Sequence, residues 1–292
     1  MSPLQSLKDA LVTPAGAEAE KESCLRIIDT LLGLLKDFER PLIDPPEFTS
    51  FRIKVLRSTD SDGVTISYFH HGPSTASAAI PSICPTRNTA QKFGFPLVAR
   101  MREIADTFVA NAQDYPQQGL GAGPKILSHD TGWRWLDGYT PKFDFSIPGG
   151  REMRCTGAWD MPGNKHPHMK AVVYNVVDGR EESLCRGEIL TILGIMAERM
   201  RMERFKDHIV VPLLPSYKVM IFSFMGQRHG RILIPYFDGR QLIIRKSPLY
   251  LFTSTDHEGM DELTRYQAGE IMRYADLMAY RLELALQEWS HL

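Results

Sequence analysis

Cysteine is scarce in this chain of 292 residues, and its four cysteines stand far apart. Cys24, Cys84, Cys155 and Cys185 include no pair at the C-x-x-C spacing of zinc and redox sites. Scattered cysteines are typical of reduced thiols, because disulfides form in oxidising compartments. The sequence therefore predicts a protein of the cytoplasm or the nucleus.

Long apolar runs are also lacking. The run at residues 31–35 has charged neighbours at Asp29, Lys36 and Asp37, and it is far shorter than the roughly 20 residues that cross a bilayer. Residues 1–10 lack the basic start and the continuous apolar segment of a secretory signal. We therefore expect no association with a membrane.

Charge of one sign is not in excess. The chain has 34 Lys and Arg against 35 Asp and Glu, so a general electrostatic affinity for nucleic acid or anionic lipid is excluded. Only a local basic patch could bind a polyanion. The composition, 43% hydrophobic and 24% charged, is typical of a soluble globular protein with a real core.

The common nucleotide and hydrolase motifs are absent from the sequence. It contains no G-x-x-x-x-G-K-[S/T] phosphate loop and no G-x-S-x-G nucleophile elbow. The glycines of residues 119–123 do not have the G-x-G-x-x-G spacing of dinucleotide sites. The sequence therefore predicts no cofactor.

Two histidines, His166 and His168, precede an apolar run, and in an extended chain their side chains would point the same way. A catalytic zinc ion needs at least three protein ligands. No carboxylate follows at a suitable spacing, and Pro167 favours a bent loop. We therefore predict a polar loop that leads into a buried strand, and no metal site.

Hydrophobic periodicity predicts the elements of the chain. Apolar residues have helical spacing over residues 24–38, 95–112, 189–200 and 260–289, and Ser183 is the expected cap of the third helix. Alternation or short apolar runs predict strands over residues 51–55, 64–68, 133–136, 143–147, 170–177, 208–214, 219–224, 231–237 and 242–245.

Three further residues constrain these strands. Pro235 cannot donate to a strand ladder, so it predicts an edge or a bulge in its strand. Trp133 and Trp135 could line a ligand pocket or bury one face of a strand, and the sequence leaves both readings open.

These elements predict an α+β fold with a mixed β-sheet and flanking helices. We expect a flexible leader over residues 1–20 and a single domain over residues 21–292. Within the domain, residues 21–90 form an added helix and hairpin, residues 95–250 form the core, and residues 258–290 form a long C-terminal helix.

The predicted hairpin over residues 226–246 is rich in arginine, with Asp238 as its one acidic residue. Guanidinium groups on a sheet edge suit phosphate or carboxylate ligands. The alternative is a solvated hairpin whose charges prevent pairing with other sheets. The candidate binding residues are Arg228, His229, Arg231, Arg240 and Arg245.

The predicted order from residue 95 onward is a helix, about three strands, a helix that bears Glu188, and further strands. This order resembles the restriction-endonuclease-like or PD-(D/E)XK core. Segments 185–193, 212–214 and 238–245 also look similar to uncharacterised fungal proteins. The nuclease resemblance implies that a helix glutamate, a strand aspartate and an acid-x-Lys motif bind magnesium and activate water.

Matched residue by residue, the resemblance implies that Glu103 is the helix acid and Asp144 the strand acid. Positioned carboxylates suit a hard divalent cation that activates water. The acid-x-Lys positions of the next strand hold Val173 and Asn175 instead. The resemblance therefore implies a degenerate, inactive nuclease, in which Glu103, Asp144 and Glu188 are the remaining candidate catalytic residues.

Three classes of function follow. The first, which we favour, is a non-catalytic protein that binds nucleic acid or a protein partner through residues 226–246. The second is a metal-independent enzyme that acts on a small organic molecule in an apolar pocket, with Asp144, Glu188 or His229 as acid or base. The third is an interaction protein that forms a homodimer through its C-terminal helix. The sequence leaves substrate, partner and oligomeric state open.

Overall fold

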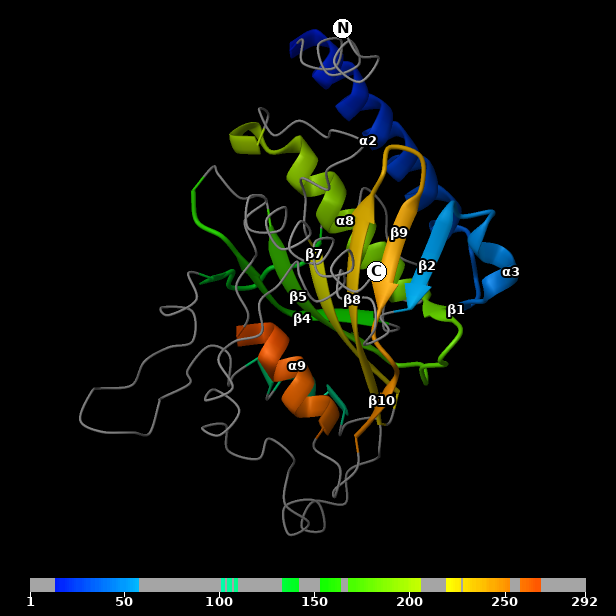
Figure 1. The fold of residues 1–292 in the computed structure, drawn as a ribbon, viewed down its shortest axis with the longest axis vertical. Coiled ribbons are helices and arrows are strands. Elements are labelled where there is room, and N and C mark those ends of the chain that lie inside the picture. Colours follow the sequence, from blue (N-terminus) through cyan, green and yellow to red (C-terminus); the bar gives the residue numbers. More distant parts are fainter. Residues whose placement is uncertain are drawn as a thin grey trace, which may run out of the picture.

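In a computed structural model of the chain, the described residues form a mixed β-sheet with helices against both faces (Figure 1). The structure describes residues 14–57, 101–102, 104–106, 108–109, 133–141, 153–163, 168–205, 219–226, 228–252 and 258–268.

The main sheet has eight strands among the described residues, in the order β2-β9-β8-β7-β5-β4-β3, and β10 also pairs with β8. The pairs β2–β9 and β5–β7 are parallel and the others are antiparallel, which confirms the predicted α+β class with a mixed sheet. The strands are β2 Ile53–Arg57, β3 Arg134–Trp135, β4 Met153–Asp160, β5 Met169–Asn175, β7 Val219–Met225, β8 His229–Phe237, β9 Leu242–Lys246 and β10 Tyr250–Leu251.

The helices lie on the two faces of this sheet. A second, small sheet pairs one short strand near the first helix with one that leads into the central helix. The remaining elements are α2 Pro14–Lys36, β1 Leu42–Ile43, α3 Pro45–Phe48, β6 Leu184–Cys185, α8 Arg186–Arg201, the 3-10 turn η2 Glu203–Phe205 and α9 Glu258–Ala268.

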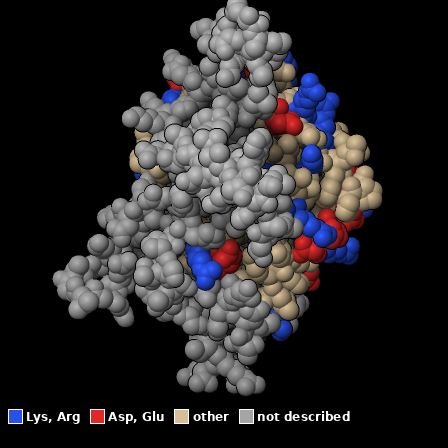
Figure 2. All heavy atoms as spheres, in the orientation of Figure 1, with Lys and Arg blue, Asp and Glu red and all other residues tan. Residues whose placement is uncertain are grey.

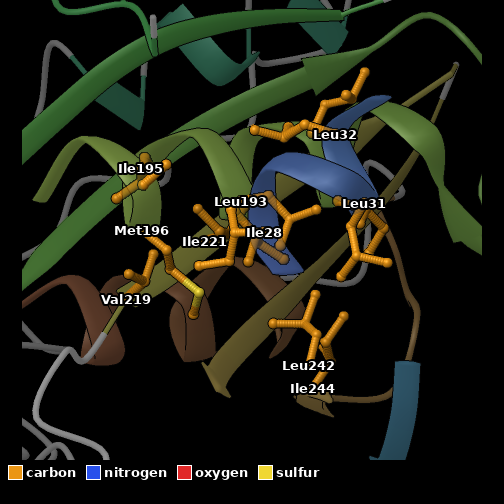
Figure 3. Packing of buried hydrophobic residues seen from close by; sticks show 14 of the residues in the cluster. Ile28, Leu31, Leu32, Leu193, Ile195, Met196, Val219, Ile221, Leu242 and Ile244 are labelled. Carbon is orange, nitrogen blue, oxygen red and sulfur yellow. The ribbon is translucent and has the colours of Figure 1, made fainter. Parts of the chain in front are cut away.

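Alternation along the central strands divides the core into two layers. In β5, Ala171 and Val173 face α8, whereas Val172 and Tyr174 face the opposite side. The first layer is filled by apolar side chains of α2 and α8 that pack on β7 and β9 (Figure 3). The second layer holds helical residues of the 101–109 segment and of α9. Because both faces are covered, the central strands are apolar on both sides.

The start of α8 differs from the prediction. Cys185, not Ser183, is the N-cap residue, and its backbone N–H donates to the Glu188 carboxylate at 2.7 Å. The Ser183 hydroxyl instead donates to the carboxylate of Asp44 at 2.6 Å. Glu188 thus satisfies one of the backbone donors that a helix start leaves without an intrahelical partner.

The predicted N-terminal region also needs correction. Helix α2 begins at Pro14, earlier than the helix predicted over residues 24–38, and includes residues 14–20 of the predicted leader. Strand β2 exists as expected, but among the described residues it pairs in parallel with β9. The predicted partner strand at residues 64–68 lies outside the described residues.

Several other predictions can be compared with the structure. Met101, Ile104 and Phe108 are buried on one side of a helical segment, as predicted. Strand β4 was not predicted at all. The predicted C-terminal helix is described only as α9, and the strands predicted at residues 143–147 and 208–214 lie outside the described residues.

Pro235 lies in β8 between two neighbouring strands. The register of β8 with β7 ends at Leu233, whereas its register with β9 continues through Pro235 and Ile244. Strand β8 is thus not an edge strand, contrary to the prediction, but Pro235 lies beyond its described pairing with β7, where the missing N–H interrupts no pairing.

Candidate functional site

The arginines of the predicted binding hairpin do not form one patch. Arg228 lies in the turn before β8 and Arg240 in the turn after it, and both side chains are exposed. A strand of this length separates its ends by about 30 Å, at roughly 3.3 Å per residue. His229 and Arg245 are half-buried.

Arg231, another predicted binding residue, lies in the core and not on the surface. Its side chain is 0% exposed and pairs with Glu188, which is also 0% exposed. Arg231 Nε donates to Glu188 Oε1 at 2.9 Å and Nη2 donates to Oε2 at 2.5 Å. A third donor, Nη1, reaches the carbonyl of Ser183 at 2.9 Å. Burial opposes the charged form, but Glu188 outweighs it and raises the pKa of Arg231.

The positions that replace the nuclease motif are also internal. Val173 and Asn175 are 0% and 1% exposed and lie on the side of β5 that faces α8. Asn175 Nδ2 donates to Ser223 Oγ at 3.2 Å. A Cβ atom on Gly187 would lie 2.3 Å from Asn175 Oδ1, so the first turn of α8 packs directly on this side chain.

Two of the predicted catalytic residues, Glu103 and Asp144, lie outside the described residues. The third, Glu188, is held by Arg231 and by the N-cap N–H of α8. His166 also lies outside the described residues, and His168 is buried just before β5. Within the described ranges, no three His, Cys, Asp or Glu side chains are grouped as metal ligands.

The two tryptophans of β3 and its approach bury a face of the sheet. Trp133 is 2% exposed and belongs to the second core layer. The ammonium nitrogen of Lys170 lies 4.3 Å from the centre of its ring and donates to the carbonyls of Tyr266 and Gln267 at the end of α9. Trp135 packs on Trp159 with ring centres 5.1 Å apart.

A cluster that the sequence did not predict surrounds Asp160, the last residue of β4. Three arginines converge on its carboxylate, and we call this group the Asp160 cluster. Arg134 of β3 donates through Nε and Nη2 at 3.0 Å each, to Oδ1 and Oδ2. Arg199 of α8 donates through both terminal nitrogens to Oδ2 at 3.2 Å. Arg204 of η2 donates to the same oxygen at 3.0 Å.

The Asp160 cluster runs from the core to the surface. The side chains of Asp160 and Arg199 are 1% and 2% exposed, whereas those of Arg204 and Arg134 are 32% and 51% exposed. Phe205 lies beneath two of the guanidinium groups, with Arg204 Cζ 4.6 Å from its ring centre. Burial and the positive charge of Arg204 lower the pKa of Arg199. The negative charge of Asp160 raises this pKa, but by less.

Two errors explain why sequence analysis missed this cluster. Strand β4 was not predicted, so Asp160 had no assigned position opposite Arg134, its register partner. The charged segment around Arg204 has the pattern of a solvated helix face, and its three-dimensional partner lies 44 residues away. Only the excess of arginine around residues 199–204 was a signal.

Part of the described surface mixes both charges. On the face drawn in Figure 2, basic and acidic side chains lie next to each other on the side of α3 and β2. The ion pair of Arg57 with Glu182 is exposed, and that of Arg40 with Glu47 joins an exposed arginine to a half-buried glutamate. None of the helices in the described part of the chain is both long enough and apolar enough to span a membrane.

The chain was compared with known proteins at three levels. No family model matches it, and no match was found among curated protein sequences or among solved structures.

Proposed function

We propose that this chain is a non-catalytic nucleic-acid-binding protein on a degenerate nuclease-like core. The order of the described elements supports the proposal. Helical residues at 101–102, 104–106 and 108–109 precede β3, β4 and β5, and the short β6 and then α8 come before β7, which is parallel to β5. This order is similar to the helix, about three strands, helix and further strands of the resemblance, with β4 as a strand that the sequence did not predict and the predicted strand at residues 143–147 outside the described residues.

The absence of catalysis in this proposal is supported by one observation, the burial of the second half of β5 beneath α8. Val173 and Asn175 stand where a nuclease needs a carboxylate and a lysine, and both are buried beneath α8. Glu188, which follows Gly187 in the first turn of α8, already accepts from Arg231 and from its own helix cap. Val173 and Asn175 offer no carboxylate and that of Glu188 is already paired, so these described residues do not supply the ligands that a divalent cation requires.

The contact with nucleic acid is assigned to the exposed ends of the hairpin. Arg231 is internal, so Arg228 and Arg240 are the candidate arginines of the hairpin that remain exposed, one at each turn. Their separation of about 30 Å corresponds to roughly nine base-pair steps along a duplex. Both arginines reach a single duplex only if it is about ten base pairs long or longer.

Binding of a fluorescently labelled duplex of about 20 base pairs, measured by anisotropy over a salt series, tests this proposal. We expect Arg228→Ala and Arg240→Ala each to reduce the slope of log K against log salt by about one. Arg26→Ala is the matched control, because Arg26 is an exposed arginine of α2 with only an i,i+4 partner.

Three results would contradict the proposal. One is the absence of binding even at low salt. Another is a double variant of Arg228 and Arg240 with the same salt slope as the unmodified protein. A slope that falls equally in the Arg26 variant would also argue against a defined contact at the hairpin.

A further inference from the structure

The charges of the Asp160 cluster do not balance. Three guanidinium groups share one carboxylate, and none of Arg134, Arg199 and Arg204 contacts another acidic side chain among the described residues. The cluster therefore holds three positive charges against one negative charge. Asp160 Oδ2 alone accepts from all three arginines, so its acceptor capacity is used up.

Two donors in this cluster have no acceptor. The Nε atoms of Arg199 and Arg204 are buried and make no hydrogen bond in the described structure. A buried donor without an acceptor costs about 1–3 kcal/mol, and more when the group is charged. The bidentate contact of Arg134 alone would neutralise the Asp160 carboxylate, so the other two arginines are not needed for that purpose.

Other features offset only part of the excess. Arg199 lies in the last turn of α8, whose C-terminal end carries about half a negative charge. The ring of Phe205 lies 4.6 Å from Arg204 Cζ and 5.6 Å from Arg199 Cζ, and a ring face attracts cations weakly. The Glu198 carboxylate accepts from Tyr139 at 2.8 Å and forms no ion pair with these arginines in the described structure. More than one positive charge still lacks a partner.

We propose that the Asp160 cluster is a binding site for a phosphoryl group. The ligand would approach from solvent past Arg204 and Arg134, whose side chains are 32% and 51% exposed. The buried Arg199 would contact it from the protein interior. Asp160 does not contact the ligand but holds the three guanidinium groups together. A phosphoryl dianion matches the excess of two charges, and its oxygens match the planar donors of guanidinium groups.

This site goes beyond the proposed function, because it is formed by other residues than the hairpin turns and needs no nuclease-like core. The same chemistry has two sources, a small phosphorylated molecule and the terminal phosphate of a nucleic acid. A carboxylate carries only one charge and leaves the cluster unbalanced, so the phosphoryl group is the better fit.

Inorganic phosphate is the probe for the first experiment. Its binding is followed at constant ionic strength by titration calorimetry and by the shift of the melting temperature, since a ligand of the native state raises that temperature. We expect Arg204→Gln to weaken phosphate binding at least tenfold. Its melting temperature without phosphate is expected to stay the same or rise, because repulsion with Arg199 is relieved.

Matched variants keep the test decisive. Arg201→Gln is the control, since Arg201 is an exposed arginine at the same helix end that pairs with Asp29 at 2.6 Å. It should bind phosphate as the unmodified protein does. Arg204→Lys keeps the charge but loses the planar donors, so we expect an intermediate affinity. If Arg204→Gln does not fold, the more exposed Arg134→Gln provides the same comparison.

The proposal is overturned if phosphate neither binds nor stabilises the unmodified protein, or if Arg204→Gln and Arg134→Gln bind it unchanged. Oligonucleotides with a 5′-phosphate or a 5′-hydroxyl then separate the two sources. Tighter binding of the phosphorylated strand, lost in Arg204→Gln, assigns the site to nucleic-acid ends. Equal binding of both strands, with phosphate binding intact, assigns it to a small phosphorylated molecule. Neither result depends on Arg228 or Arg240, so the hairpin proposal can fail independently.

Discussion

Glu188 and Arg231 bring opposite charges into a part of the core where neither side chain is exposed. Each charge is tolerated there because the partner and several backbone groups satisfy it. The pair joins the first turn of α8 to the middle of the sheet, and thus fixes the position of the helix over β8. Removing either partner leaves an uncompensated buried charge.

Glu188→Ala is therefore expected to lower the free energy of unfolding by about 3–5 kcal/mol. Urea denaturation followed by circular dichroism measures this loss. Glu182→Gln is the matched control, because Glu182 pairs with Arg57 where both side chains are about 60% exposed, 59% and 61%. An exposed pair contributes at most about 1 kcal/mol. Equal losses in the two variants would show that the buried pair is not a main determinant of stability.

The thiol of Cys155 gives the stability a dependence on alkaline pH. Burial raises its pKa from an ordinary 9.0 to about 12. The neutral thiol thus stabilises the fold fully below pH 9, and this contribution is lost as the pH rises toward 12. Between these values the unfolded chain releases a proton that the folded chain retains.

We expect Cys155→Ala to flatten the alkaline fall in unfolding free energy by up to about 1.4 kcal/mol per pH unit. Urea denaturation at about pH 8 and about pH 10.5 provides the comparison. Other titrating groups affect both proteins and cancel in the difference. An unchanged slope would mean that the thiol ionises as easily in the folded protein as in the unfolded chain.

At the scale of elements, α2 is held by its packing on α8 and by a cap on its end. Ile28 and Leu35 are 0% exposed and belong to the first core layer, where Figure 3 shows Ile28 beside side chains of α8. Arg186, the first residue of α8, donates to the carbonyl of Phe38 at 2.6 Å and to that of Leu35 at 3.4 Å. A cation at a helix C-terminus is favourable.

Adjacent leucines of α2 allow a direct test of this packing. Leu35→Ala should destabilise the protein by about 2–5 kcal/mol, as buried leucines do. Leu34 is 49% exposed, and Leu34→Ala should change the unfolding free energy by no more than about 0.5 kcal/mol. Thermal or urea denaturation of both variants is sufficient. A small loss for Leu35→Ala would mean that α2 is not docked on α8 in solution.

Elements with a strong local signal were predictable from sequence. Strands β5, β7, β8 and β9 combine apolar runs with turns that contain glycine, and the structure contains all four. Strand β4 lacks this signal, since Arg154, Thr156 and Gly157 interrupt its pattern. Gly157 is required by tertiary contact, because a Cβ atom there would lie 2.8 Å from Val109. The residues next to Gly157 in the sequence give no indication of this contact with a distant segment.

At the scale of the whole molecule, the candidate sites depend on contacts between distant segments. The parallel pairing of β2 with β9 joins residues 53–57 to residues 242–246, and sequence periodicity contains no information about it. The ion pair of Glu188 with Arg231 spans 43 residues, and the Asp160 cluster draws on four separate elements. Sequence alone identified charged residues, but burial decided which of them face a ligand.

Burial also changes which arginines are available for binding. Arg231 stabilises the core, Arg228 and Arg240 remain at opposite turns, and the excess charge of the Asp160 cluster lies elsewhere. The protein is thus expected to contact polyanions at defined points and not through one broad basic surface. Its net charge of −1 agrees with this expectation.

Binding without cleavage is the central claim, and one assay measures both. A labelled duplex of about 20 base pairs is incubated with the protein at low salt, with and without Mg²⁺ or Mn²⁺. Anisotropy gives the bound fraction, and a denaturing gel of the same samples gives the length of the strands. We predict salt-dependent binding and intact strands under every metal condition. Metal-dependent cleavage, or no binding at low salt, would contradict the claim.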